Sequence, residues 1–252
     1  MTKWELDMSV RTMYSYLNQG LFTARDIDLK RKVRFKPRKC HKTQITNRTV
    51  FFNRLYSDFC KLEPASSVEM DTVHSSRESK KTLLTLFFTK EKLFLAFLMN
   101  RCTEGAVRLV FDRLEKRMGT YEFASAFEYI LTDCGSEFGD PVALETGINE
   151  IQRSSIYYCA PMQSGQKDGL EQAHTMLRMI LPKGISFEFL TQWDVNTIVN
   201  HINSTPRESL GGRTPYSMAL ETFGEEVLKA FQLKLIEPDQ VNLTPKLIRF
   251  NH

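Results

Sequence analysis

Short apolar runs alternate with amphipathic helical patterns from residue 68 onward, and this alternation limits the fold more than any other feature of the sequence. Residues 68–73 form a short run that contains Asp71. Residues 81–89 and 92–100 are two longer apolar runs around the charged residues 90–92, which is the pattern of a β-hairpin. Three strands are therefore expected before the first long helix.

The second part of the pattern continues the alternation. An amphipathic helix is expected over 104–119, ended by Gly119, and a fourth strand over 126–133. A loop or short helix to about residue 152 separates it from a fifth strand over 154–160, and a helix over 168–181 follows. Three strands, a helix, a strand, a helical stretch, a strand and then helices predict a mixed α/β layer fold.

Three carboxylates fall at informative points of this order. Asp71 lies within the first strand, Asp133 ends the fourth, and Glu171 lies in the first turn of the helix after the fifth. In a ribonuclease H type of fold the first and fourth strands are neighbours, and the three acids converge at one edge of the sheet. Converging carboxylates repel one another unless cations lie between them. The alternative is that Asp133 only begins a turn at Cys134 and Gly135, as Asp commonly does.

Such a carboxylate cluster predicts a particular chemistry. Mg²⁺ prefers hard oxygen ligands and keeps positions open for water and substrate phosphate. Two Mg²⁺ ions, or two Mn²⁺ ions, can activate a water or a DNA 3′-hydroxyl on one side and stabilise the leaving oxygen on the other. The expected reactions are phosphodiester hydrolysis and transesterification.

The cationic charge is concentrated in the N-terminal part of the chain. Residues 1–62 carry 14 Lys and Arg against five Asp and Glu, a charge of +9, so the remaining 190 residues carry −5 and the whole chain +4. This separation suits a polyanionic partner, because Lys and Arg neutralise phosphates. The candidate DNA-binding residues of this arm are Arg11, Lys30, Arg31, Lys32, Arg34, Lys36, Arg38 and Lys39. The alternative is a solvated basic linker without a partner.

A helix is expected just upstream of the most basic stretch. Ser9 is a suitable N-cap, Gly20 a stop, and Val10, Met13, Tyr14 and Leu17 share one face. The segment has the pattern of the second helix of a helix-turn-helix, whose first helix would need residues before Met1.

Cysteines and apolar runs exclude several classes of protein. The five cysteines include no Cys-x-x-Cys pair and no His pair at zinc-finger spacing, so neither disulfides nor structural zinc is expected. No apolar run approaches the roughly 20 residues that span a bilayer, and the N-terminus lacks the apolar core of a secretory signal. We expect a cytoplasmic, nucleoid-associated protein.

Several segments together resemble a known family. "SVRTMYSYL", "MDTV", "LTDCGSEF", "YYCAPMQSGQKDGLEQAHTMLRMILPKG" and "HINSTPRESLGGRTPYSMAL" occur in this order. They are similar to bacterial transposases of the insertion sequence 30 family, which belong to the DDE transposases and share the retroviral-integrase catalytic core. The resemblance extends over about residues 8–223.

The resemblance implies roles for the three acids. The family's first, second and third catalytic and metal-binding acids fall on Asp71, Asp133 and Glu171, at separations of 62 and 38 residues that are similar to those of the family. It implies a ribonuclease H-like five-stranded mixed sheet flanked by helices, a basic and partly helical N-terminal arm, and an oligomer that acts on transposon ends and target DNA.

The chain also departs from the family pattern. Cys134 stands where the family has Asn, Gly165–Gly169 replaces a Trp-Gln-Arg-Gly stretch, and Leu170 and Gln172 replace Asn on both sides of the Glu. The family's Trp before the first acid is absent. Family members also carry an additional N-terminal helix-turn-helix that binds the transposon ends, and the chain begins too late to contain it.

Polar residues near the third acid have two interpretations. Lys167, Arg178 and Lys183 are candidates for contacts with DNA phosphates, and His174 lies on the same helix. A solvated helix face with ion pairs between neighbouring turns is the alternative. Glu137 and Asp140 could add a metal contact or could simply lie in a loop.

The predicted organisation follows from these patterns. Residues 1–62 form a DNA-binding arm, 63–223 the integrase-like catalytic core, and 224–252 a C-terminal helix and tail. Two functions stay open: a DDE transposase that cleaves DNA and transfers strands, or a catalytically silent, truncated derivative that binds DNA as a competitor or regulator. A ribonuclease H or other nuclease with the same core is a third, which leaves the basic arm unexplained.

Overall fold

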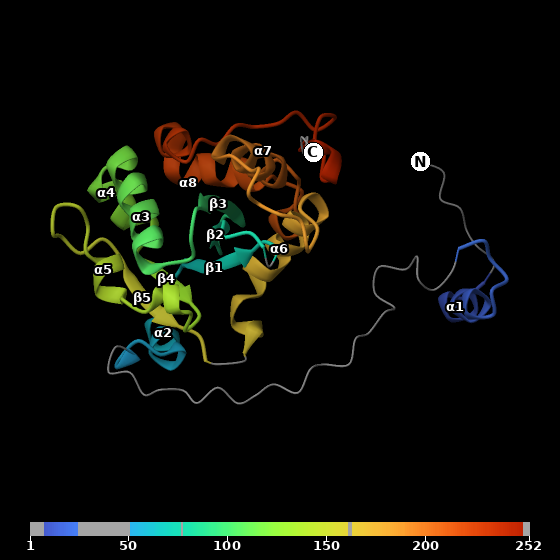
Figure 1. Cartoon of the computed structure of the whole chain (residues 1–252), viewed down its shortest axis with the longest axis horizontal. Helices are drawn as coiled ribbons and strands as arrows, with labels where there is room; N and C mark the ends of the chain where they lie inside the picture. The colour runs from blue at the N-terminus through green and yellow to red at the C-terminus, as the bar shows by residue number, and fades with distance from the viewer. Residues whose placement is uncertain (1–7, 25–50, 77, 161–162, 249–252) are drawn as a thin grey trace. The chain divides into compact units, whose positions relative to one another are not determined.

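The computed structural model describes residues 8–24, 51–76, 78–160 and 163–248 (Figure 1). The chain divides into two compact units, residues 1–46 and 47–252, and each is considered by itself. None of the described helices is long and apolar enough to cross a membrane.

The described part of the first unit contains one helix, α1 (Val10–Asn18). The Ser9 hydroxyl caps it by accepting a hydrogen bond from the backbone N–H of Thr12 at 3.1 Å. Gly20 follows with φ of +70°, a conformation that favours glycine. The helix, its cap and its stop were all predicted, and α1 buries none of its side chains.

The second unit is built on a five-stranded mixed sheet in the order β3-β2-β1-β4-β5. Its strands are β1 (Val68–His74), β2 (Thr82–Phe88), β3 (Leu93–Met99), β4 (Tyr129–Thr132) and β5 (Ser155–Tyr158). β2 is antiparallel to β1 and β3, whereas β4 is parallel to β1 and β5. The predicted hairpin and the predicted neighbourhood of the first and fourth strands are confirmed.

Helices cover both faces of this sheet. In Figure 1 α3 and α4 lie on one side of the strands and α6 on the other. The helices before the C-terminal region are α2 (Tyr56–Leu62), α3 (Glu104–Met118), α4 (Thr120–Ala126), α5 (Pro141–Glu145) and α6 (Asp168–Ile180), with short 3₁₀ turns η3 (Ser136–Phe138) and η4 (Ser164–Lys167). β2 is buried along its whole length, which explains its continuous apolar sequence.

The fourth strand begins later than predicted. Gly119 ends α3 as expected, but its φ of +95° lets the chain turn directly into α4, which ends at Ala126. The strand therefore runs over Tyr129–Thr132 and not over 126–133. Phe123 and Phe127 stack with ring centroids 4.4 Å apart and are fully buried, so tertiary packing decides the structure of this apolar stretch.

The C-terminal region completes the core with α7 (Gln192–Asn203) and α8 (Pro215–Ala230). Val195, Ile198, Val199 and Ile202 recur at helical spacing along α7 and are all buried. Thr214 caps α8 and Pro215 begins it, while Gly224 with φ of +79° interrupts it. A 3₁₀ turn, η6 (Pro245–Leu247), precedes Ile248, which also joins the core.

The segment before β1 is attached to the second unit. Leu55 forms a parallel bridge with Tyr158 of β5, and the Arg54 side chain pairs with Glu145 of α5. The backbone N–H of Tyr158 donates to the Arg54 carbonyl at 2.8 Å. Leu55 thus adds one bridge at the β5 edge of the sheet, just before α2. The domain boundaries drawn after residues 62 and 223 stay predictions.

One glycine fixes how closely α6 approaches the sheet. A Cβ atom on Gly169 would lie 2.3 Å from Cε1 of the Phe87 ring on β2. No side chain fits at that distance without movement of the ring or the helix. The first turn of α6, which carries Glu171, is therefore placed by this contact.

Replacement of Gly169 by Ala is expected to lower the free energy of unfolding by about 1–3 kcal/mol, the usual cost of overpacking. The matched control is Gly165→Ala, since a Cβ there would meet only Asp168 Oδ1, at 3.7 Å. Urea unfolding of both variants measures the difference. Equal stability of the two would contradict the close packing of α6 on β2.

Candidate functional site

The candidate site lies where β1 and β4 separate. The two strands pair only through Val68 with Ile130 and Glu69 with Leu131. One residue further on, the Met70 carbonyl accepts a hydrogen bond from the Thr132 hydroxyl at 3.1 Å. The next residues of the two strands are Asp71 and Asp133, so parallel pairing brings the first and second predicted acids to the same edge of the sheet.

Asp71 is held by a backbone group and by a cation. Its Oδ1 accepts from the N–H of Thr72 at 2.7 Å, and its Oδ2 pairs with Lys167 Nζ at 3.1 Å. Lys167 is only 7% exposed, and its ammonium also donates to the Met70 carbonyl at 3.3 Å. A buried ammonium thus contacts the first acid, where Lys167 had been predicted to contact DNA phosphates.

Asp133 is exposed to solvent, and the charges of neighbouring groups act on its carboxylate. Its Oδ1 accepts from the N–H of Gly135 at 3.0 Å, which fixes the turn after β4. Partial loss of hydration raises the pKa of Asp133, the Lys167 ammonium opposes this rise, and the negative charge of Asp71 adds to it. The two acids therefore repel each other, and Lys167 relieves part of that repulsion.

Glu171, the third predicted acid, is exposed in the first turn of α6. Lys167 precedes it by four residues, one helical turn. Among the described residues, the one group of three or more His, Cys, Asp or Glu with ligand atoms within 4.8 Å of one another does not include Asp71, Asp133 or Glu171. The structure therefore brings the first two acids together and leaves Glu171 outside such a cluster.

Side chains of the sheet fasten the start of α6. Glu69 Oε2 accepts from the backbone N–H of Leu170 at 2.7 Å, a favourable place for a carboxylate at a helix N-terminus. Burial raises the pKa of Glu69, and the bond from Leu170 opposes that rise. One turn later His174 Nε2 lies 2.8 Å from the Thr85 hydroxyl, which donates to the Asp71 carbonyl at 3.0 Å.

The predicted DNA-binding cations have different surroundings. Arg178 donates to the backbone carbonyls of His74 at 3.0 Å and Leu181 at 3.4 Å, whereas Lys183 and Arg11 are exposed. The other predicted contacts lie outside the described residues: Lys30, Arg31, Lys32, Arg34, Lys36, Arg38 and Lys39.

The two acids of the loop after β4 have separate tasks. Asp140 Oδ1 accepts from the N–H of Ala143 at 3.0 Å and caps α5. Glu137 turns back to β1, where its Oε1 accepts from the Thr72 hydroxyl at 2.6 Å. Burial of the Cys102 thiol and its contact with Glu137 raise the pKa of Cys102 to about 11.

One group of side chains with ligand atoms within 4.8 Å of one another was not predicted from the sequence. It consists of His74, Cys102 and Glu137, which come from the end of β1, the loop before α3, and η3. Its members are 28 and 35 residues apart, so no local motif joins them. Only the sheet topology brings them together.

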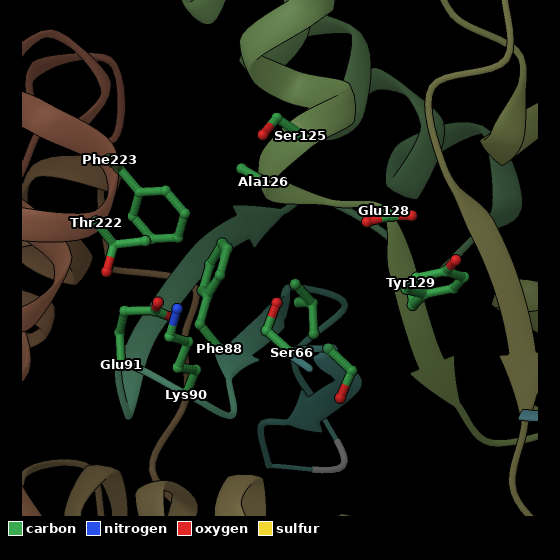
Figure 2. Close-up of a pocket in the computed structure, with 12 residues that line it drawn as sticks. Ser66, Phe88, Lys90, Glu91, Ser125, Ala126, Glu128, Tyr129, Thr222 and Phe223 are labelled. Atoms are coloured by element: carbon green, nitrogen blue, oxygen red, sulfur yellow. The ribbon is translucent and has the colours of Figure 1, made fainter. Parts of the chain in front are cut away.

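A cavity of about 120 Å³ lies at the opposite edge of the sheet. Figure 2 shows its walls, with Ser66 before β1, Phe88 and Glu91 around the hairpin turn, and Phe223 of α8. Phe88 and Phe223 form an edge-to-face pair with ring centroids 5.4 Å apart. None of the predicted site residues lines this cavity, so it is separate from the carboxylate site.

The chain is similar in sequence to integrases and transposases of mobile elements. It is 23% identical over 223 residues to the putative integrase ORF3 of Spiroplasma virus SpV1-R8A2 B, over 87% of this chain and 65% of that protein. It is 24% identical over 206 residues to the probable transposase of insertion-like sequence element IS1161 of Streptococcus salivarius, over 81% of this chain and 56% of that protein. The chain thus spans less than two thirds of the length of these relatives.

A shorter match points in the same direction. Over 86 residues, 34% of this chain and 25% of the other, the chain is 31% identical to the transposase of insertion sequence element IS4351 of Bacteroides fragilis. No protein-family model matches the chain. The chain is therefore similar to transposases and integrases at low identity, and these matches do not single out the insertion sequence 30 family.

Two solved structures were found to be similar. The catalytic core domain of BIV integrase has a TM-score of 0.43 at 19% identity, over 62% of this chain and 93% of that chain. The simian T-cell lymphotropic virus intasome in complex with a PP2A regulatory subunit gives a TM-score of 0.48 at 13% identity, over 62% of this chain and 54% of that chain. The ribonuclease H-like mixed sheet flanked by helices, predicted from the sequence, is confirmed by the order and directions of the strands.

The half-buried imidazole of His174 next to this site gives a pH-dependent stability. Burial lowers the pKa of His174 from 6.5 to about 4, so the folded protein holds the ring neutral. The unfolded chain binds a proton below about pH 6.5 that the folded chain does not bind. The free energy of unfolding should therefore fall as the pH decreases from 6.5 towards 4.

His174→Gln removes the titrating ring and keeps a group that can hydrogen-bond to Thr85. Urea unfolding of the parent and the variant between pH 7 and pH 4 is expected to give curves that converge as the pH falls. Parallel curves over this range would show that His174 is not held neutral by the fold.

Proposed function

We propose that the chain is a DDE transposase of the insertion sequence 30 family that cleaves DNA at transposon ends and transfers the strands to a target. Asp71, Asp133 and Glu171 are the proposed catalytic and metal-binding residues. Homology to transposases and integrases supports the reaction class.

The observation that carries this proposal is that Asp71 and Asp133 lie at one edge of the sheet. The ammonium group of Lys167, at the start of α6, lies beside them. Lys167 Nζ lies 3.1 Å from Asp71 and lowers the pKa of Asp133 against the effect of desolvation. A pair of carboxylates that needs a positive charge nearby is a suitable cation site. Their oxygen atoms are the hard donors that Mg²⁺ and Mn²⁺ prefer.

When bound, two Mg²⁺ or Mn²⁺ ions would supply a nucleophilic hydroxyl and stabilise the leaving oxygen of a phosphodiester. Asp71 and Asp133 would hold the ions on the rigid ends of adjacent strands. Glu171 would contribute from α6, whose position is fixed by the contacts of Glu69 with Leu170 and of Gly169 with Phe87. The protein's share of the chemistry is to orient the ions and the DNA.

DNA would be bound by the basic residues of the arm, together with Lys183 and Arg178 around α6. The partners are transposon ends and target DNA in the nucleoid of the host cytoplasm. Two ends have to be joined to one target, which favours a homo-oligomer assembled on DNA.

Asp133→Asn is expected to abolish nicking of supercoiled plasmid in Mg²⁺ or Mn²⁺, because the amide keeps the shape of the side chain and removes the charge that holds the metal. The matched control is Asp140→Asn in the same loop. Asn is as good an N-cap as Asp, so α5 stays capped and nicking should continue at the parent rate. Equal nicking by the parent and Asp133→Asn would refute the role of Asp133.

One observation favours the second candidate, a catalytically silent DNA-binding derivative. Lys167 pairs with Asp71, and Glu171 lies outside any described cluster of metal ligands. If the ammonium held Asp71 permanently, divalent ions would be excluded. Absence of nicking by the parent, together with retained DNA binding, would support this alternative.

Lys167→Met tests how the ammonium and divalent ions compete. Removal of a positive charge 3.1 Å from Asp71 should raise the affinity for Mn²⁺, by about fivefold or more, since nearby unit charges interact by at least about 1 kcal/mol. Titration of Mn²⁺ followed by electron paramagnetic resonance measures the change. The double variant Asp71→Asn with Lys167→Met should lose the gain, and an unchanged affinity in Lys167→Met would show that Lys167 does not compete with the ion.

A further inference from the structure

A group of three side chains of metal-ligating types lies at the end of β1, on the face opposite Asp71. One ligand atom from each of His74, Cys102 and Glu137 lies within 4.8 Å of the other two. His74 is exposed, while Cys102 and Glu137 are half-buried. The group contains a nitrogen, a sulfur and an oxygen donor, and is thus different in composition from the pair Asp71 and Asp133.

The topology of the sheet explains why these residues meet. β1 and β3 are both antiparallel to β2, so they end at the same edge, where β2 begins. His74 is opposite Thr82, which is opposite Met99, and Cys102 follows Met99 by three residues. η3 follows β4, which is parallel to β1 and ends at this edge too.

Hydrogen bonds already orient two of the three ligands. The Thr72 hydroxyl donates to Glu137 Oε1 at 2.6 Å, and the Cys102 thiol hydrogen-bonds to Glu137. Burial acts to raise the pKa of Glu137, but hydrogen bonds, first of all from the Thr72 hydroxyl and also from the Cys102 thiol, lower it overall, with a smaller contribution from the nearby His74. The three side chains therefore interact with one another and not only with their own segments.

A buried hydroxyl lies behind the thiol of this group. Thr82 is 4% exposed, and among the described residues its Oγ1 has no hydrogen-bond partner of ordinary geometry, although it interacts with the neighbouring Cys102 thiol. A buried hydroxyl without a partner costs free energy. A metal-bound thiolate would accept a hydrogen bond from it, since sulfur that has lost its proton to the metal becomes a charged acceptor. Thr82 would then support the ligand from behind, as residues around metal sites commonly do.

We propose that His74, Cys102 and Glu137 form a site for one Zn²⁺ ion. Thiolate and imidazole ligands select zinc over magnesium. Three protein ligands with a fourth position left open is the usual arrangement of an accessible zinc site, and exposed His74 leaves one side of the group to solvent. The ion would tie the end of β1, the loop before α3 and η3 to one another.

This site is separate from the carboxylate pair. Side chains alternate between the two faces along a strand, so Thr72 and His74 point away from the face that carries Asp71. The zinc proposal goes beyond the proposed function, because binding of Zn²⁺ does not require DNA, cleavage or an intact set of catalytic acids.

Equilibrium dialysis of the full chain against Zn²⁺ in excess Mg²⁺ tests the site, because Mg²⁺ occupies hard oxygen sites. The expected result is one Zn²⁺ per chain. Cys102→Ser, His74→Gln and Glu137→Gln should each weaken binding by at least about tenfold, the loss that even residues behind a metal ligand cause. With Co²⁺ as a probe, the parent should show thiolate-to-metal absorption that Cys102→Ser lacks.

The controls separate this site from other thiols and from the carboxylate pair. Cys60→Ser changes an exposed cysteine on α2 and should bind Zn²⁺ as the parent does. Asp133→Asn changes the neighbouring acid and should still bind one Zn²⁺ per chain. His74→Gln changes an exposed residue and keeps the test valid if Cys102→Ser fails to fold. The proposal is overturned if the parent binds no Zn²⁺ in excess Mg²⁺, if His74→Gln binds as tightly as the parent, or if Asp133→Asn abolishes binding.

Discussion

The parallel pairing of β1 with β4 is the contact on which the candidate site depends. Only two residue pairs join the strands, Val68 with Ile130 and Glu69 with Leu131. The next residue of β1, Met70, is beyond the last backbone pair with β4. Its carbonyl accepts hydrogen bonds from the Thr132 hydroxyl and the Lys167 ammonium instead. A buried carbonyl requires such partners. The separation of the strands thus gathers polar backbone and side-chain groups at the positions of Asp71 and Asp133.

The position of α6 is the second constraint. Glu69 binds its first turn, Gly169 allows contact with Phe87, and Thr85 bonds to His174 one turn later. All three contacts come from β1, which carries Asp71, and from its neighbour β2. The helix that carries Lys167 at its start and Glu171 in its first turn is therefore fixed by the same strands that position Asp71.

Much of this architecture could be predicted from local patterns, and the exceptions have physical causes. The hairpin, the succession of strands and helices along the chain, the cap at Ser9 and the end of α3 at Gly119 follow from periodicity and residue type. The place of the fourth strand beside the first was expected from the ribonuclease H type of fold. The helix α4 could not be predicted, because the apolar stretch around Phe123 and Phe127 suits a strand as well as a helix, and the packing of those two rings decides between them. The ion pair of Lys167 with Asp71 joins residues 96 positions apart, for which sequence spacing has no signal.

The alternation of side chains along β1 also explains why two kinds of metal ligand meet at one sheet edge. Asp71 faces α6 with a hard carboxylate, while Thr72 and His74 face the side of Cys102 and Glu137. The carboxylates of Glu137 and Asp133 both approach Gly135. A Cβ atom on this glycine would lie 2.8 Å from Glu137 Oε2 and 3.0 Å from Asp133 Oδ1. Glu137 is close enough for its negative charge to act on Asp133. A cation at the His74 group would neutralise that charge and weaken the attraction of the Asp133 side for a second cation, so occupation of one face would be electrostatically coupled to occupation of the other.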